Sequence, residues 1–280
     1  MASSTAELRS RAAPHGADGA RLLVAKVDHV ATIEMAEPER RNALSLAMLD
    51  ALSASLTTAI TDTATRAIVL SAQGPAFCAG HDLKELSSHR ADSDNGRAFF
   101  ETTFGLCADL MQLIANSPKP VIAAVEGIAT AAGCQIVASC DLAVAGDHAR
   151  FCTPGVQIGL FCATPMVALS RAVSRHHALE MLLLGEAVPA SEAYRFGLVN
   201  RVVPAGTALA AALDLARRIA LVSPGAVTTG KAAFAKQSGL PLDEAYKAMS
   251  AVMVENLLQA DAREGISAFL DKRKPHWTAT

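Results

Sequence analysis

The spacing of apolar and polar residues changes along the chain from a strand-like to a helix-like period. Residues 21–26 and 29–35 alternate, which predicts two strands joined as a hairpin. Short apolar runs at 67–71, 121–125 and 142–145 predict strands that are buried on both faces. Because helical patterns separate these runs, we predict an α/β fold with a parallel sheet and crossover connections.

Three helical patterns lie beside these strands. The first follows Asn42, a candidate cap, and has leucine at positions 46, 49, 52 and 56. Residues 96–116 form a long amphipathic pattern, and the small residues at 130–140 predict a closely packed helix. Residues 74–83 predict a loop within which a further helix begins.

Beyond residue 205 the pattern is helical throughout. The four candidate helices span residues 208–221, 225–237, 242–260 and 263–272. The first 20 residues are small, polar and aperiodic, which is typical of a disordered terminus. We therefore predict three parts: a disordered tail (1–20), an α/β core (21–204) and a C-terminal helical region (205–280).

Composition disfavours nucleic acid and membranes as partners. The chain of 280 residues has a formal net charge of −2, so any anion it binds must be met by local charge. The most apolar stretch, residues 120–145, is interrupted by Glu126, Gly127, Gly133 and Asp141, so no apolar run reaches the ~20 residues needed to cross a bilayer. A hydrophobic fraction of 51% instead indicates a sizeable buried core.

The cysteines are expected to be reduced. An even number of cysteines suggests disulfides in a small secreted chain, but we find no apolar signal segment here and no CxxC spacing, which also disfavours a zinc site. Glu7 and Asp18 argue against a transit peptide, so the expected location is the cytoplasm. The six cysteines are Cys78, Cys107, Cys134, Cys140, Cys152 and Cys162.

Two loops have the composition of a ligand site. Residues 77–84 and 126–134 each follow a predicted buried strand and lead into a helix. Taken singly, the first is an ordinary turn, and the small residues of the second serve helix packing equally well. Taken together, two strand–loop–helix units can direct two backbone N–H groups at one oxygen, which is the geometry that stabilises an oxyanion.

These loops belong to a series of blocks that resembles the enoyl-CoA hydratase/isomerase (crotonase) family from about Leu22 to Trp277. The blocks are PERRNAL (38–44), FCAGHDLKEL (77–86), PVIAAVEGIATAAGCQIVASCDLAVA (120–145), FCTPGVQIGL (151–160), LLLGEAVPASEAYRFGLVNRVVP (182–204) and AFLDKRKP (268–275). The resemblance implies a crotonase spiral of ββα units with a helical C-terminal trimerisation region. It also implies a homotrimer or hexamer, placed in the mitochondrial matrix if the source is eukaryotic.

The resemblance assigns roles to particular residues. The backbone N–H groups of His81 and Ala132 would form the oxyanion hole for the carbonyl of an acyl-CoA or enoyl-CoA thioester. Coenzyme A is implied as part of the substrate or ligand, with no tightly bound cofactor and no metal. The implied coenzyme A contacts are Arg41, Ala43, Ala79, His81, Asp82, Leu83, Lys84, Phe269 and Lys272.

The chain departs from the family's hydratases at two positions. Those enzymes have glutamate two residues after the glycine of the small-residue helix and directly after the proline of the FxxP block; here these positions are Gln135 and Gly155. Because general acid–base groups contribute about 10²–10⁴-fold in rate, standard hydration is expected to be impaired. No replacement base is evident: His81 titrates near neutrality, but its backbone is the predicted donor.

Three hypotheses remain open at this point. The chain is an acyl-CoA enzyme with an unidentified proton carrier, or a non-catalytic acyl-CoA binder or partner subunit, or an interaction protein that binds no coenzyme A. The third leaves residues 77–84 and 268–275 unexplained.

Overall fold

The computed structural model describes residues 21–278, so the predicted tail at 1–20 lies outside the described residues. The chain starts with the predicted hairpin, in which β1 (Leu22–Val27) and β2 (Val30–Met35) pair antiparallel. The predicted buried strands are confirmed as β3 (Ala67–Ala72), β5 (Val121–Val125) and β7 (Leu142–Gly146). With β10 (Arg201–Val203) they form a six-stranded sheet in the order β1-β2-β3-β5-β7-β10, parallel from β2 onward.

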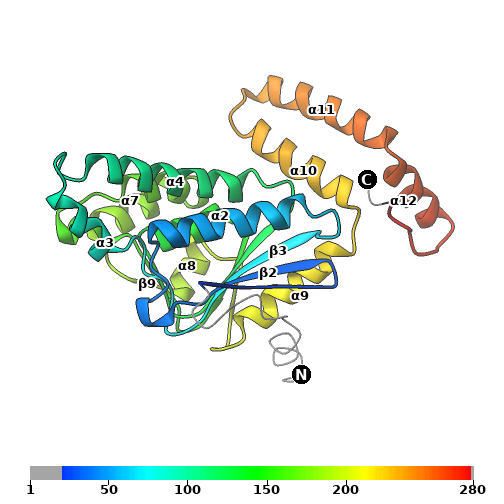
Figure 1. Cartoon of the computed structure of the whole chain (residues 1–280). Helices are drawn as coiled ribbons and strands as arrows, with labels where there is room; N and C mark the ends of the chain where they lie inside the picture. Colours follow the sequence, from blue (N-terminus) through cyan, green and yellow to red (C-terminus); the bar gives the residue numbers. More distant parts are fainter. Residues whose placement is uncertain (1–20, 279–280) are drawn as a thin grey trace.

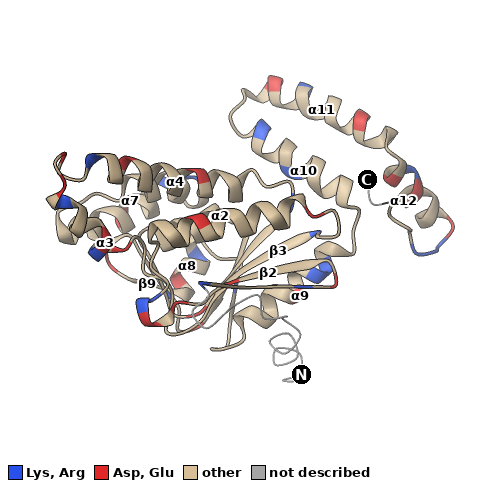
Figure 2. Ribbon diagram, in the orientation of Figure 1, with Lys and Arg blue, Asp and Glu red and all other residues tan. Residues whose placement is uncertain are grey.

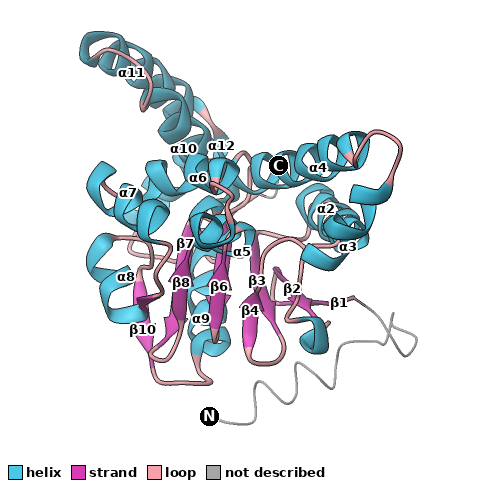
Figure 3. Cartoon of the chain, turned by 90° about the vertical axis from the view of Figure 1, so that its left-hand side faces the viewer, coloured by secondary structure: helices cyan, strands magenta, loops and turns pink. Residues whose placement is uncertain are grey.

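A second, smaller sheet comes from segments between the main strands. Its four short strands are β4 (Ala76–Cys78), β6 (Ile128–Thr130), β8 (Arg150–Cys152) and β9 (Val188–Pro189). The prediction of a loop at 74–83 was therefore wrong at residues 76–78, because three residues are too few for β4 to show an alternating pattern. Figure 3 shows the strands of both sheets side by side, as in the crotonase spiral.

Several helices pack against the two sheets. The long ones are α2 (Leu46–Thr61) and α4 (Arg97–Ala115), and α5 (Ala132–Ser139) packs on both β4 and β6. The shorter ones are α3 (Leu83–Ser88), α6 (Ala163–Ala172), α7 (Arg175–Leu184) and α8 (Ala190–Phe196), with 3-10 turns η1 (Pro38–Arg40), η2 (His89–Ala91) and η3 (Pro154–Ile158). The leucines of α2 at 49, 52 and 56 are buried, as their spacing predicts.

The cap of α2 differs from the prediction. Ser45 caps the helix, because its side chain accepts a hydrogen bond from the N–H of Met48. Asn42 is instead fully buried three residues earlier, in a left-handed conformation (φ 52°). Its side chain accepts from the N–H of Glu37 and donates to the carbonyls of residues 73 and 76, so it joins η1 to the start of β4.

Helix α4 is long and apolar enough, by length and composition, to cross a membrane. Core helices pass the same test, so this is weak evidence for a span. In α4 the side chains of Cys107, Leu110 and Ile114 are buried in the main hydrophobic cluster, which gives the helix a packing role.

The four predicted C-terminal helices are confirmed and behave in two ways. Helix α9 (Ala208–Ala220) packs its buried alanines against β3, β5 and β7. Helices α10 (Pro224–Gln237), α11 (Leu242–Leu258) and α12 (Ala260–Leu270) extend from the core as an arm (Figure 1). The boundary near residue 205 stays a prediction, and the packing of α9 leads us to propose one between 221 and 223.

Asp261 of α12 links this helix to the start of α10 and to the C-terminal segment. Its carboxylate is 8% exposed and accepts hydrogen bonds from Ser223 Oγ (2.6 Å) and from the N–H (3.0 Å) and hydroxyl (2.9 Å) of Thr278. Burial raises the pKa of this carboxyl, but the hydrogen bonds outweigh burial and hold the pKa below its ordinary value. Nearby, Trp277 Nε1 donates to the carbonyl of Leu221 (2.8 Å).

Asp261→Asn is expected to destabilise the arm by about 1.5–3 kcal/mol at pH 7, the usual worth of hydrogen bonds to a charged group. Because the folded-state pKa is depressed, this stabilisation exists above the unfolded pKa near 3.9 and is lost as pH falls through the folded value. Urea unfolding at pH 7 and pH 3, followed by the fluorescence of the single tryptophan Trp277, measures both effects. An equal difference between variant and wild type at the two pH values would contradict the ionised network.

Candidate active site

The two loops singled out by the sequence lie side by side. Strands β4 and β6 are parallel neighbours, with Ala76 opposite Ile128 and Cys78 opposite Ala129. Their carboxyl ends therefore open at the same edge of the small sheet, where ligands of α/β proteins bind. A Cβ atom added at Gly80 would lie 2.9 Å from the Ala131 Cβ and 3.0 Å from the Thr130 carbonyl oxygen. The loops thus touch through their backbones.

The predicted oxyanion-hole donors, the backbone N–H groups of His81 and Ala132, differ from their neighbours in having no acceptor within the described residues. The N–H of Asp82 donates to the carbonyl of Leu44 (3.3 Å), and that of Ala131 donates to the carbonyl of Cys152 (2.9 Å). By contrast, the backbone N–H groups of His81 and Ala132 find no acceptor among residues 21–278. Ala132 is the first residue of α5, where N–H groups have no partner within the helix.

Close packing holds the two donors near one another. A Cβ atom at Gly80 would lie 3.3 Å from the Ala132 nitrogen, and one at Gly133 would lie 2.3 Å from the Cys78 carbonyl oxygen. Ala131 has φ 50° and ψ −117°, a strained conformation for a residue with a side chain. The same small residues therefore allow close packing and bring the two N–H groups near one another.

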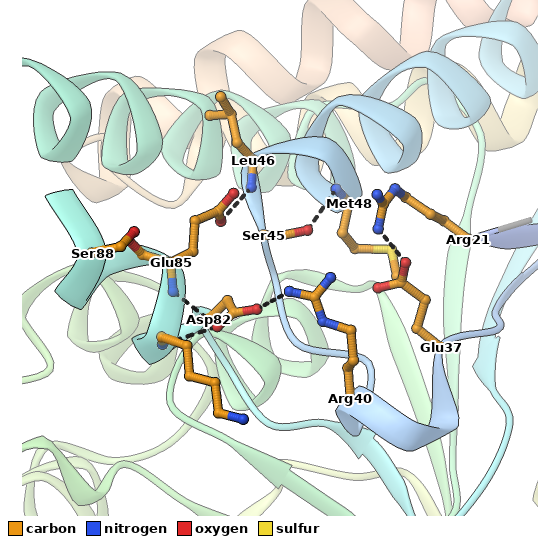
Figure 4. Close-up of polar contacts among 10 residues, drawn as sticks. Arg21, Glu37, Arg40, Ser45, Leu46, Met48, Asp82, Glu85 and Ser88 are labelled. Atoms are coloured by element: carbon orange, nitrogen blue, oxygen red, sulfur yellow. Dashed lines mark hydrogen bonds and ion pairs between the residues drawn. The ribbon is translucent and has the colours of Figure 1, made fainter. Parts of the chain in front are cut away.

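The loop that carries His81 is anchored by acidic side chains (Figure 4). Asp82 Oδ1 caps α3 by accepting from the N–H groups of Lys84 (3.0 Å) and Glu85 (3.2 Å), and Asp82 Oδ2 pairs with Arg40. Glu85 Oε2 accepts from the N–H of Leu46 (3.0 Å) at the start of α2. Burial raises the pKa of the Asp82 carboxyl, but these hydrogen bonds and Arg40 bring it below its ordinary value.

Sequence reasoning missed Arg40 and Glu85 as anchors. The pattern Asp82-x-x-Glu85 has the form of an N-terminal helix cap and could have indicated the start of α3. Arg40 gave no such signal, because its partner is 42 positions away.

Most of the predicted coenzyme A contacts come together. The N–H of Ala79 donates to the carbonyl of Arg41 (3.0 Å), and the N–H of Leu44, beside Ala43, donates to the carbonyl of Gly80 (2.8 Å). Leu83 (56% exposed) and Lys84 face solvent next to these segments, whereas Asp82 is buried. Residues 41–44 and 79–84 thus form one continuous surface.

Phe269 and Lys272 do not join that surface within one chain. They lie at the end of α12 and just after it, while α3 lies at the opposite end of the molecule (Figure 1). The Phe269 side chain is 83% exposed, so nothing in the described chain covers it.

The two positions without glutamate have different surroundings. Gln135 is 4% exposed, and its Oε1 has no hydrogen-bond partner within the described residues. At Gly155 a Cβ atom would lie 2.9 Å from both the Cys162 Sγ and the Leu160 carbonyl oxygen. The segment 160–162 therefore occupies the space into which a side chain at 155 would extend.

The thiols and Glu126 are poor candidates for proton transfer. Burial raises the pKa of Cys78 and of Cys107 to about 12, and it also raises the pKa of Cys134, Cys152 and Cys162. Thiolates are therefore disfavoured at neutral pH. Glu126 Oε1 accepts from the N–H of Ala208 (2.8 Å), which fixes it at the start of α9. Within residues 21–278 no group of three His, Cys, Asp or Glu side chains is placed to hold a metal ion.

Fold and sequence together define the class of this protein. Residues 26–280 match the sequence model of the enoyl-CoA hydratase/isomerase family, and the chain belongs to that family. Figure 2 shows basic and acidic residues interspersed along the ribbon.

Individual relatives resemble the chain over most of its length. It is 48% identical over 251 residues to mouse (Mus musculus) "Enoyl-CoA hydratase domain-containing protein 3, mitochondrial", covering 90% of this chain and 82% of the relative. It is 35% identical to "2,3-dehydroadipyl-CoA hydratase" of Escherichia coli, covering 91% and 97%. The crystal structure of the human domain-containing protein 3 superposes with a TM-score of 0.87 at 46% identity, covering 92% of this chain and all of that one.

Proposed function

We propose that this protein binds an acyl-CoA or enoyl-CoA thioester and holds its carbonyl oxygen between the N–H groups of His81 and Ala132. The observation that carries the proposal is the pair of unpartnered N–H groups on two loops in backbone contact. Membership of the enoyl-CoA hydratase/isomerase family supports a thioester as the ligand. Such preorganised donors stabilise the negative charge that develops on the oxygen during reaction.

Residues 41–44 and 79–84 are proposed to hold the coenzyme A portion, mostly through their backbones. Arg41 and Lys84 supply positive charge for its phosphates. The anchoring of Asp82 and Glu85 to Arg40 and α2 keeps this segment in place. In this proposal coenzyme A is part of the substrate, and neither a metal nor a tightly bound cofactor takes part.

We infer that the site is completed by another copy of the chain. Phe269 and Lys272 of one copy would close over coenzyme A bound by the next, since they lie far from the loops of their own chain. The arm exposes large apolar side chains, each 69–83% exposed, that a homotrimer or hexamer would cover. These are Phe234, Leu242, Tyr246, Leu258, Phe269 and Leu270. The location is proposed to be the cytoplasm, or the mitochondrial matrix in a eukaryote, where relatives are named mitochondrial.

Among family reactions, standard hydration is expected to be slow. Gln135 cannot take a proton near pH 7, and Gly155 has no side chain. The packing of segment 160–162 against Gly155 also favours the second candidate function, a non-catalytic acyl-CoA binder or partner subunit.

Two measurements on the purified protein test the proposal. Calorimetric titration with butyryl-CoA is expected to give saturable binding. Hydration of crotonyl-CoA, followed by loss of the enoyl absorbance, is expected to run at least about 10²-fold below a known hydratase. Absence of binding would exclude thioester recognition, and a rate equal to that of the hydratase would show that another group replaces the glutamates.

Restoring the second glutamate is expected to fail for steric reasons. Gly155→Glu should lower the free energy of unfolding by about 1–3 kcal/mol, because its Cβ meets the Leu160 carbonyl and Cys162 Sγ. Gln135→Glu adds no volume, but its carboxyl would be buried without a partner, so burial should raise the pKa of the carboxyl and any loss of stability would come from desolvation and not from steric overlap. Urea unfolding of the two variants compares them, and equal stability of wild type and Gly155→Glu would show that segment 160–162 yields easily.

A further inference from the structure

The imidazole of His81 is buried without a well-formed hydrogen bond, and within residues 21–278 the only polar group that acts on it is the backbone of Leu44. Neither Nδ1 nor Nε2 has a partner among the described residues, and both atoms are shielded from solvent. The ring packs edge-to-face on Phe104 of α4, with 4.9 Å between the ring centroids and an interplanar angle of 78°. A buried polar group left unpaired costs about 1–3 kcal/mol, so this arrangement is unfavourable unless a ligand uses it.

No charged group is directed at this ring. On its own segment, Asp82 pairs with Arg40, Glu85 accepts from Leu46 and Lys84 is exposed. On α4, Glu101 pairs with Arg97 and Asp109 is exposed, and α5 carries no charged residue. Burial disfavours the charged form and lowers the pKa of the imidazole, and an interaction with the backbone of Leu44 offsets only part of this effect. The ring is neutral at pH 7, with one nitrogen able to accept a proton.

We propose that the imidazole of His81 is the proton acceptor of this site, in the role for which the two glutamates are missing. The inference rests on the proposed function, because the backbone N–H of the same residue would hold the thioester oxygen. A single residue would then provide the donor for the oxyanion and the base beside it.

The proposed step is reversible proton transfer at the carbon next to the thioester carbonyl. The C–H bond breaks, its proton moves to an imidazole nitrogen, and its electron pair forms the enolate, whose oxygen is held by the two N–H groups. The imidazolium then returns a proton to the same carbon. No oxidant, reductant or second substrate is needed, and in D₂O the returned hydrogen is deuterium.

The other groups near the loops are less suited to this step. Gln135 stays neutral, and the buried thiols resist ionisation because their pKa values are raised. Gln135 Oε1 is a second buried atom without a partner in the described chain. We assign it a hydrogen bond to the ligand or to water, since an amide can position but cannot transfer a proton near pH 7.

The test is deuterium incorporation into butyryl-CoA in D₂O, followed by mass spectrometry. His81→Gln retains the backbone N–H and a polar side chain, and is expected to slow exchange by about 10²–10⁴-fold with unchanged calorimetric affinity. The wild-type rate should fall as pH drops through the imidazole pKa, which lies below the ordinary value of 6.5. His177→Gln is the matched control, because His177 likewise contacts a phenylalanine ring, by stacking, but lies on α7, and its exchange should match wild type.

Four results of these measurements would contradict the proposed role of the His81 imidazole. Equal exchange by wild type and His81→Gln would overturn the role of His81 and leave thioester binding intact. Wild type that binds butyryl-CoA but exchanges at no pH would also overturn it, in favour of a non-catalytic binder. Absence of binding would overturn this inference together with the proposed function. If His81→Gln does not fold, a wild-type rate that does not decline at acidic pH contradicts the proposal by itself.

Discussion

Replacing Gly133 with alanine is expected to lower the free energy of unfolding by about 3 kcal/mol, at the upper end of overpacking effects. The added Cβ would lie 2.3 Å from the Cys78 carbonyl oxygen and 2.7 Å from the Cys78 Cβ. Backbone cannot rotate away as a side chain does, so α5 must move from β4. Urea unfolding measures the loss of stability. A separate calorimetric titration with butyryl-CoA measures how far the site is disturbed.

Gly230→Ala provides the matched control for this change. Gly230 lies inside α10, and a Cβ there has nothing within 4 Å. Because glycine in a helix interior is less favourable than alanine by about 0.5–1 kcal/mol, this variant should be more stable than wild type. If Gly133→Ala were as stable as Gly230→Ala, the close approach of α5 to β4 would not be a constraint.

Replacing Ala132 with proline is expected to remove one donor of the proposed oxyanion hole. Proline has no N–H and is well accepted at the first position of a helix, which Ala132 occupies in α5, but it also disfavours the conformation of the preceding Ala131 (φ 50°, ψ −117°). Loss of such a donor typically lowers turnover by about 10²–10³-fold, or about 2.7–4 kcal/mol. The expected results are slower deuterium exchange into butyryl-CoA and a smaller downward shift of the bound carbonyl stretch in infrared spectra of ¹³C-labelled thioester.

Ala132→Gly separates the donor from the side chain. It retains the N–H, so its carbonyl shift should equal that of wild type. The infrared measurement does not require turnover and therefore applies equally to an enzyme and to a silent binder. An unchanged shift in Ala132→Pro would show that this N–H does not contact the thioester oxygen.

The sequence left open whether the small residues at 126–134 serve packing or a ligand site. Small residues at 126–134 are explained both by packing and by a ligand site. The distances at Gly127 and Gly133 show that packing alone requires glycine at these two positions. The free N–H groups of His81 and Ala132 are a separate observation that packing does not explain, and on that observation the proposed site depends.

The sequence by itself determined the main elements and the family. Buried strands such as β5, a run of five apolar residues, and the helices beyond residue 205 follow from local periodicity, which depends only on neighbouring residues. The blocks that resemble the family led to the same conclusion that the family match supports. The replacement of both glutamates by Gln135 and Gly155 is likewise read directly from the chain.

Only the tertiary structure decided how distant residues meet. It placed β4 inside an expected loop, gave the cap of α2 to Ser45, and joined Arg40 to Asp82 across 42 positions. It filled the space beside Gly155, left the imidazole of His81 unpaired and carried Phe269 away from the loops. Each of these depends on contacts between segments far apart in sequence, whose geometry local patterns of apolar and polar residues do not contain.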